Sequence, residues 1–255
     1  KYIKADGIDI TSKIVSDDKA YENTDLRYFN KDFLMRKQYV PNEYMYYFYN
    51  REQAVENILG AERTRGEQIA DINEKMTEEL SNIDIEKDFE KALEIFDYYY
   101  GLRENSYMAS ETGEKRNSTW HFDMYAPDDG GYAGVALGII DAKNSTEKSR
   151  IIACVPNDNK ALDFLSESDT VEISCEIVDG KVTPIKIGDV PFENKEIITR
   201  VKAYERLASK AIINCDRESA VDCLYLHPLV GSYSLAEKLV DEYIELNKDF
   251  TGEWK

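Results

Sequence analysis

The sequence predicts an α+β protein that is mostly helical and carries one small antiparallel sheet. Apolar residues recur at helical spacing over several stretches, and two short apolar runs, at about 150–155 and 170–178, have the character of strands. Apolar residues make up 42% of the 255-residue chain and aromatic residues 11%, which is ample for a sizeable core. No low-complexity linker or internal repeat divides the chain. We therefore expect one domain over residues 1–255 rather than two smaller ones.

The first elements are expected to be a short hairpin and a tyrosine-rich helix. Tyr2-Ile3 and Ile8–Ile10 flank a turn dipeptide, Asp6-Gly7. Pro41 and Asn42 supply a helix start, and Gly60 supplies an end. Between them, apolar and aromatic residues recur at helical spacing: Tyr44, Tyr47, Phe48, Val55, Ile58 and Leu59. Tyr44 therefore falls in the first turn of a single predicted helix, and packing in the core is the ordinary role of such aromatic residues.

A second helix is predicted to begin at a capping box formed by Thr64 and Glu67. Its apolar stripe consists of Ile69, Ile72, Met76 and Leu80. Arg65 takes the first helical position, where a cation opposes the helix dipole and free backbone N–H groups favour an anion. Arg65 is therefore a candidate ligand for a phosphate or carboxylate, although an arginine in a first turn is often only solvated.

The remaining elements follow from similar signals. A third helix is predicted from Asp84 to a stop at Gly101, and residues 101–128 are expected to be mostly loop. Residues 130–142 are expected to be helical despite their glycines. The strand at 170–178 should turn at Asp179-Gly180 into a partner that begins at Lys181. Helices are then predicted over 193–214, 216–226 and 233–247.

Charge and composition exclude several classes of function. The net charge of −18 would repel a nucleic-acid backbone or an anionic membrane, and no basic tract or zinc-finger spacing appears. No apolar run approaches the length of about 18 residues that a transmembrane helix needs. The four cysteines show no C-x-x-C spacing and are too sparse for a disulfide framework, which predicts reduced, buried thiols in a cytoplasmic protein.

Common catalytic motifs are also missing from the sequence. It contains no G-x-G-x-x-G after a strand, no Walker loop and no G-x-S-x-G. Its two histidines are His121, in a polar region, and His227, at a predicted helix end, and neither is expected to bind a metal. The many carboxylate pairs are expected to form a solvated face. A self-contained active site is therefore hard to build from these residues alone.

Three short segments carry a recognisable pattern: Asp-Gly-Ile-Asp-Ile-Thr at 6–11, Pro-Asn-Glu-Tyr-Met-Tyr-Tyr at 41–47 and Thr-Arg-Gly-Glu at 64–67. With further segments in order along the chain, they resemble the NAD- and metal-dependent family 4 glycoside hydrolases, particularly the 6-phospho-β-glucosidases. Residues 6–11 resemble that family's Gly-x-Asp-Val-Thr segment, residues 41–47 its P-x-x-Y-L-x-Y-Y motif, and residues 64–67 its T-R-x-E. Residues 131–140 resemble a Gly-x-Tyr-Ala…Ile-Ile stretch, and residues 155–172 resemble V-x-N…V-E. The closing segments at 216–218, 227–231 and 236–242 follow the family's last helices in order, whereas residues 101–128 correspond poorly.

The resemblance implies the fold of the family's C-terminal domain, which is similar to that of lactate and malate dehydrogenases. It also implies oxidation of the sugar at C3 by NAD, removal of the C2 proton by a tyrosine, elimination of the leaving group and addition of water, a route distinct from the two-carboxylate mechanism. By position, Tyr44 would be the base and Arg65 would contribute to substrate binding. The implied cofactors are NAD and a divalent metal, manganese in the first instance. The implied partner is a phosphorylated disaccharide or glycoside, and exposed helical aromatics favour a homo-oligomer.

The family's glycine-rich nucleotide fold and its metal-binding cysteine and histidine have no counterpart in these residues, and Cys154 does not occupy the position of the metal-binding cysteine. Because the chain also starts at Lys1 without a methionine, we expect it to be the C-terminal part of such an enzyme, without the Rossmann domain. Alone, it is expected to bind no cofactor and to be inactive. Two alternatives stay open: a family member that acts on α-glucosides, galactosides or galacturonides, and a non-catalytic module for oligomerisation or sugar binding.

Overall fold

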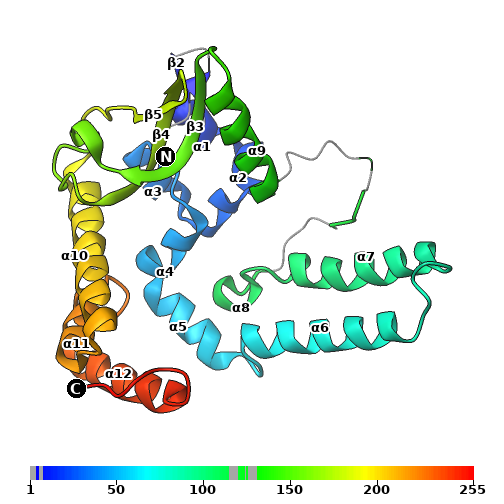
Figure 1. The fold of residues 1–255 in the computed structure, drawn as a ribbon. Coiled ribbons are helices and arrows are strands. Elements are labelled where there is room, and N and C mark those ends of the chain that lie inside the picture. The colour runs from blue at the N-terminus through cyan, green and yellow to red at the C-terminus, as the bar shows by residue number, and fades with distance from the viewer. Residues whose placement is uncertain (1–3, 6–7, 115–119, 124, 126–130) are drawn as a thin grey trace. The chain divides into compact units, whose positions relative to one another are not determined.

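The computed structural model describes residues 4–5, 8–114, 120–123, 125 and 131–255. The chain folds as two compact units, Lys1–Ala126 and Pro127–Lys255, which we call the N-terminal unit and the C-terminal unit (Figure 1). The predicted α+β class is confirmed, because helices dominate and a three-stranded antiparallel sheet accompanies them. The expectation of a single domain over residues 1–255 stays a prediction.

The N-terminal unit begins with a small antiparallel pair and continues as a series of helices. Strands β1 (Lys4–Ala5) and β2 (Ile8–Asp9) form an antiparallel pair, whereas Tyr2-Ile3, expected as the first strand, and the turn at 6–7 lie outside the described residues. The helical elements that follow are α1 (Thr11–Ser16), α2 (Asp18–Glu22), η1 (Asp25–Tyr28), α3 (Lys31–Lys37), η2 (Glu43–Met45), α4 (Tyr46–Tyr49), α5 (Arg51–Gly60), α6 (Arg65–Ser81), α7 (Phe89–Asn105) and α8 (Ala109–Thr112).

The core of this unit forms around buried residues of the short helices. These residues are Val15, Leu26, Tyr28, Phe29, Leu34, Tyr46, Ala54 and Met108. Tyr46 meets Tyr28 edge to face, with ring centroids 6.3 Å apart and an interplanar angle of 69°. Because Met108 precedes α8, the core ties the segment after α7 to the tyrosine-rich elements η2, α4 and α5.

The prediction of a single helix over 41–60 is wrong, since the stretch starts with the 3-10 turn η2 and is interrupted at Asn50. Asn50 has φ −120° and ψ 38°, which separates α4 from α5. The break also changes which side chains enter the core: Tyr46 and Ala54 are buried, whereas Val55 and Leu59 of the predicted apolar stripe are exposed. At the break the Asn50 side chain donates to the Tyr28 carbonyl at 2.9 Å, a contact between residues 22 positions apart that the periodicity of the sequence does not predict.

Helices α6 and α7 pack against each other as a helical hairpin that extends from the short helices (Figure 1). The predicted capping box is present, since the Thr64 backbone N–H donates to Glu67 Oε2 at 2.7 Å and Thr64 Oγ1 accepts from the Glu67 backbone N–H at 3.3 Å. The predicted stripe of α6 is half-buried along this contact. Across it, the Tyr99 hydroxyl donates to Glu79 at 2.5 Å, and this interaction raises the pKa of Tyr99 to about 12.

The predicted boundaries of the third helix are wrong at both ends. The helix begins at Phe89, after a turn at 84–88, and it passes through Gly101 to end at Asn105. A Cβ atom at Gly101 would lie 3.2 Å from the Trp120 carbonyl oxygen, so the glycine permits a close approach of residue 120 and does not end the helix. Part of the predicted loop at 101–128 is therefore helix, which places α7 side chains beside Arg65.

The described residues of the C-terminal unit form the predicted sheet and four α-helices. Helix α9 (Gly131–Asn144) packs against the sheet of β3 (Ser149–Pro156), β4 (Thr170–Val178) and β5 (Lys181–Pro184), which is antiparallel in the order β3-β4-β5. A short helix, η3 (Asp158–Lys160), follows β3. The predicted helices at 193–214, 216–226 and 233–247 are confirmed as α10 (Phe192–Asn214), α11 (Arg217–Leu226) and α12 (Tyr233–Asn247).

The connection from β3 to β4 is held by two polar residues. The Asn157 side chain is fully buried; its amide donates to the Leu162 carbonyl at 2.9 Å and its oxygen accepts from the Leu162 N–H at 2.9 Å. The buried Asp169 carboxylate accepts two hydrogen bonds from Arg206 of α10, at 2.8 Å and 2.5 Å. The asparagine of the V-x-N segment therefore orders a loop within this unit, and the Asp169–Arg206 pair fixes that loop to α10.

Candidate active site

Tyr44 lies in an exposed turn at the start of η2. The side chain of Asn42 caps this turn, with Oδ1 accepting from the Tyr44 backbone N–H at 2.8 Å. The Tyr44 side chain is 60% exposed, in contrast to the core packing that aromatic residues at helical spacing usually show. The phenol of Tyr44 is thus presented to solvent by a capped and therefore well-defined piece of backbone.

The two neighbouring tyrosines have different environments. Tyr46 is 4% exposed, and burial, followed by the charge of Glu114, raises its pKa. Tyr47 is half-buried, and burial raises its pKa, which the charge of Glu111 and a hydrogen bond to Glu111 raise further. Both phenols are therefore held in the protonated form. Of the three, Tyr44 is the most exposed to solvent.

Arg65 is confirmed as the first residue of α6, but it is not simply solvated. Its guanidinium donates to Ser106 Oγ at 2.5 Å and to the Arg103 carbonyl at 2.8 Å. Arg103 and Ser106 stand at the C-terminal end of α7, where a cation is favoured by the helix dipole. Burial lowers the pKa of Arg65; the charge of Glu111 opposes that shift, and the charge of Arg103 adds to it. Arg65 therefore links the start of α6 to the end of α7.

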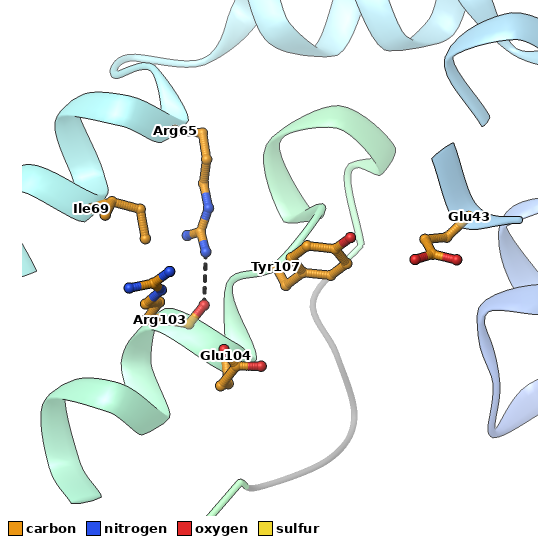
Figure 2. A pocket seen from close by; sticks show the side chains of 6 residues that line it. All are labelled: Glu43, Arg65, Ile69, Arg103, Glu104 and Tyr107. Atoms are coloured by element: carbon orange, nitrogen blue, oxygen red, sulfur yellow. Dashed lines mark hydrogen bonds between the residues drawn. The ribbon is translucent and has the colours of Figure 1, made fainter. Parts of the chain in front are cut away.

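A cavity of about 460 Å³ opens beside Arg65, within the N-terminal unit. Glu43, Arg65, Ile69, Arg103, Glu104 and Tyr107 line it. Figure 2 shows the two arginine side chains on one side, Glu43 on the other and the ring of Tyr107 between them. The cavity thus carries two cationic groups, two carboxylates and an aromatic ring, a mixture that suits a ligand with both an anionic group and hydroxyl groups.

The two predicted site residues stand in different relations to this cavity. Arg65 lines it, whereas Tyr44 follows a lining residue, Glu43, and is not itself part of the lining. A chain of electrostatic interactions connects Tyr44 to Arg65. Tyr44 and Glu111 both raise the pKa of Tyr47, and the charge of Glu111 also raises the pKa of Arg65. The structure therefore brings both residues to one region of the N-terminal unit.

Sequence reasoning missed five of the six lining residues as parts of a site: Glu43, Ile69, Arg103, Glu104 and Tyr107. The last three follow Gly101, where the helix was expected to stop. The signal that could have found them is the sequence Gly101-Leu-Arg-Glu-Asn, in which good helix formers continue the helical pattern beyond the glycine.

The candidate metal ligands in this chain are scattered. Across the described part of the chain, no group of three or more His, Cys, Asp or Glu side chains could hold a metal ion. His121 Nδ1 lies 3.0 Å from Asp97 Oδ2, and His227 caps α11 through its backbone N–H.

Cys154 is exposed, which corrects the expectation that all the thiols are buried. Within the same described residues, no helix is both long and apolar enough to cross a membrane.

Residues 1–230 match the family model described as the family 4 glycosyl hydrolase C-terminal domain. The chain belongs to this family. One curated relative is a probable 6-phospho-beta-glucosidase of Bacillus subtilis, which is 23% identical over 86% of this chain and 43% of the relative. Another is a phospho-alpha-glucosidase of Clostridium acetobutylicum, which is 23% identical over 96% of this chain and 48% of the relative. The family 4 chain thus spans about half the length of these two relatives.

Solved structures share the fold of this family 4 chain. One is the 6-phospho-beta glucosidase from Thermotoga maritima with manganese, NAD+ and glucose-6-phosphate, which matches with a TM-score of 0.67 at 21% identity, over 98% of this chain and 51% of that one. Another is a 6-phospho-alpha-glucosidase from gut microorganisms in complex with NAD and glucose-6-phosphate, with a TM-score of 0.61 at 21% identity, over 100% and 54%. The family resemblance and the fold class predicted from the sequence are confirmed.

Proposed function

We propose that this chain is the C-terminal, substrate-facing part of a 6-phospho-glucosidase, and that β-linked glucoside 6-phosphates are its substrates. The observation that carries the proposal is an exposed tyrosine, Tyr44, next in sequence to a residue of a cavity that Arg65 lines. Membership of family 4 and the 6-phospho-glucosidases among the relatives support it.

In this proposal, Tyr44 accepts the proton of the sugar C2 and Arg65 binds an anionic group of the substrate. A tyrosine has an ordinary pKa of about 10, so it acts as a base near neutral pH only where nearby charges favour the phenolate. Burial raises the pKa of both Tyr46 and Tyr47, which leaves the exposed Tyr44 as the better candidate. A guanidinium can grip a phosphate through two parallel hydrogen bonds, which both bind and orient it.

The structure of the Thermotoga enzyme contains manganese and NAD+, but the described residues of this chain do not form a set of ligands for a metal. We therefore assign no step at a metal or at NAD to this chain. In the proposal, both groups act with residues outside these 255, and the chain supplies the base and part of the sugar pocket.

The test is a panel of nitrophenyl glycosides offered to the complete enzyme with NAD and manganese. We expect turnover of the β-glucoside 6-phosphate and none of the unphosphorylated β-glucoside. Turnover of neither, with a folded protein, would favour the non-catalytic module instead. Light scattering on the same sample measures whether the enzyme is a homo-oligomer, which stays a prediction.

The second candidate is an enzyme for α-linked glucoside 6-phosphates. The Clostridium phospho-alpha-glucosidase matches 247 residues of this chain, and elimination across C1 and C2 does not require one anomer. In the same panel, preferential turnover of the α-glucoside 6-phosphate would select this candidate and leave the roles of Tyr44 and Arg65 unchanged.

A further inference from the structure

Arg103 and Arg65 present two guanidinium groups to the same cavity (Figure 2). The charge of Arg103 is close enough to lower the pKa of Arg65, so the two cations repel each other. Arg65 donates to two neutral oxygens, and the Arg103 guanidinium lies 5.7 Å from the centroid of the Tyr100 ring. In the part of the chain that the structure describes, neither guanidinium has a carboxylate within ion-pair distance. An anion between them would relieve this repulsion.

The carboxylates near the cavity act on Arg65 through their charge and form no ion pair with it among the described residues. Glu111 and Glu104 raise the pKa of Arg65 through their charge, and Glu104 lines the cavity beside Arg103. The hydrogen bonds to Ser106 Oγ and to the Arg103 carbonyl use only part of the donor capacity of Arg65, so further N–H groups remain for a ligand.

The number of acceptor oxygens on the anion then discriminates between ligands. A carboxylate offers two oxygens, which the planar fork of a single arginine already matches. A phosphate monoester offers three terminal oxygens and close to two negative charges near neutral pH, so it can accept hydrogen bonds from two guanidinium groups at once. Two arginines on one wall therefore fit a phosphate ester better than a uronate.

We propose that Arg103 is a second ligand for the substrate phosphate, and that Arg65 and Arg103 together select a phosphorylated sugar over a sugar carboxylate. This inference rests on the function proposed above. Arg103 comes from the segment that corresponds poorly to the family pattern. The sequence resemblance therefore assigns it no role, and its place at the cavity depends on the continuation of α7 past Gly101.

The experiment compares Arg103→Ala with the parent in the complete enzyme, with Arg36→Ala as the matched control. Arg36 is an exposed arginine of α3 that does not line the cavity. We expect Arg103→Ala to raise KM for the glucoside 6-phosphate by about 10–100-fold, the usual value of a charge-assisted hydrogen bond, with kcat little changed. Arg103→Lys should restore part of the affinity, since it keeps the charge but not the fork. Arg36→Ala should have the kinetics of the parent.

Calorimetric titration with inorganic phosphate supplies a readout that needs no catalysis. Phosphate affinity should fall in Arg103→Ala and in Arg103→Gln, which keeps more of the side-chain volume if the alanine variant does not fold. Unchanged KM and phosphate affinity in a folded Arg103 variant would overturn the inference and leave the proposed function standing. Equal turnover of a galacturonide and a glucoside 6-phosphate by the parent would overturn the selection of phosphate. If the parent cleaves no glycoside phosphate, the proposed function fails and the phosphate titration alone decides the role of Arg103.

Discussion

Replacement of Tyr44 by phenylalanine separates a catalytic base from a packing residue. The side chain is 60% exposed, and in the described structure its hydroxyl donates to no other residue, so its loss should leave the free energy of unfolding nearly unchanged. The loss of a positioned general base should lower kcat by about 10²–10⁴-fold, which corresponds to about 3–5 kcal/mol of transition-state stabilisation. Substrate affinity should change little.

Two further tyrosines make the experiment specific. Tyr98→Phe is the matched control, because Tyr98 is 62% exposed on α7 and does not line the cavity. Tyr47→Phe should instead lower the free energy of unfolding by about 1–3 kcal/mol, because the Glu111 carboxylate loses its hydrogen bond from the Tyr47 phenol. One oxygen of that carboxylate is already buried without a partner among the described residues.

The assay is exchange of the sugar C2 proton in deuterated solvent, followed by mass spectrometry beside steady-state kinetics. Tyr44→Phe should lose the exchange, and Tyr98→Phe should keep it. Full exchange in Tyr44→Phe together with its loss in Tyr47→Phe or Tyr46→Phe would refute the assignment of the base, and would show that a buried tyrosine of the same motif performs the chemistry.

Three other predictions follow from individual contacts. Arg65→Ala should weaken substrate binding by about 1.5–3 kcal/mol, and Arg65→Lys should restore only part of the lost affinity. If the kinetics of the alanine variant are unchanged, Arg65 serves only to link α6 to α7. Asn157→Ala should lower the free energy of unfolding by about 2–4 kcal/mol in urea, because buried backbone groups of the β3–β4 connection lose their partners; a loss below about 0.5 kcal/mol would contradict this. Hydrogen bonds from Arg206 hold the pKa of Asp169 below its ordinary value, so the pair stabilises the fold above a pH of about 4, and this contribution is lost as the pH falls through the pKa of the folded state. Asp169→Asn should therefore flatten the acid side of the stability profile, and a profile with the steepness of the parent would count against it.

Much of the fold could be predicted because local signals agree with the tertiary structure. The capping box at Thr64, the turn at Asp179-Gly180 and the long periodic stretch of α10 are each decided within a few residues. The predictions failed where tertiary contacts accompany a departure from local preference. At Asn50 the helix is interrupted and the side chain donates to the Tyr28 carbonyl, and at Gly101 a close approach of residue 120 explains a glycine inside a helix.

The sequence by itself determined the class of the fold, the family and the positions of Tyr44 and Arg65, because these depend on spacing and on short ordered motifs. Only the tertiary structure decided that Tyr44 is exposed while Tyr46 and Tyr47 are not, and that Arg65 meets Arg103, 38 residues further along the chain, at a shared cavity. The physical reason is that the burial of Tyr46 depends on the core of the short helices, and the approach of Arg65 to Arg103 depends on how α6 packs against the end of α7. That packing joins residues distant in sequence, and no local pattern encodes it.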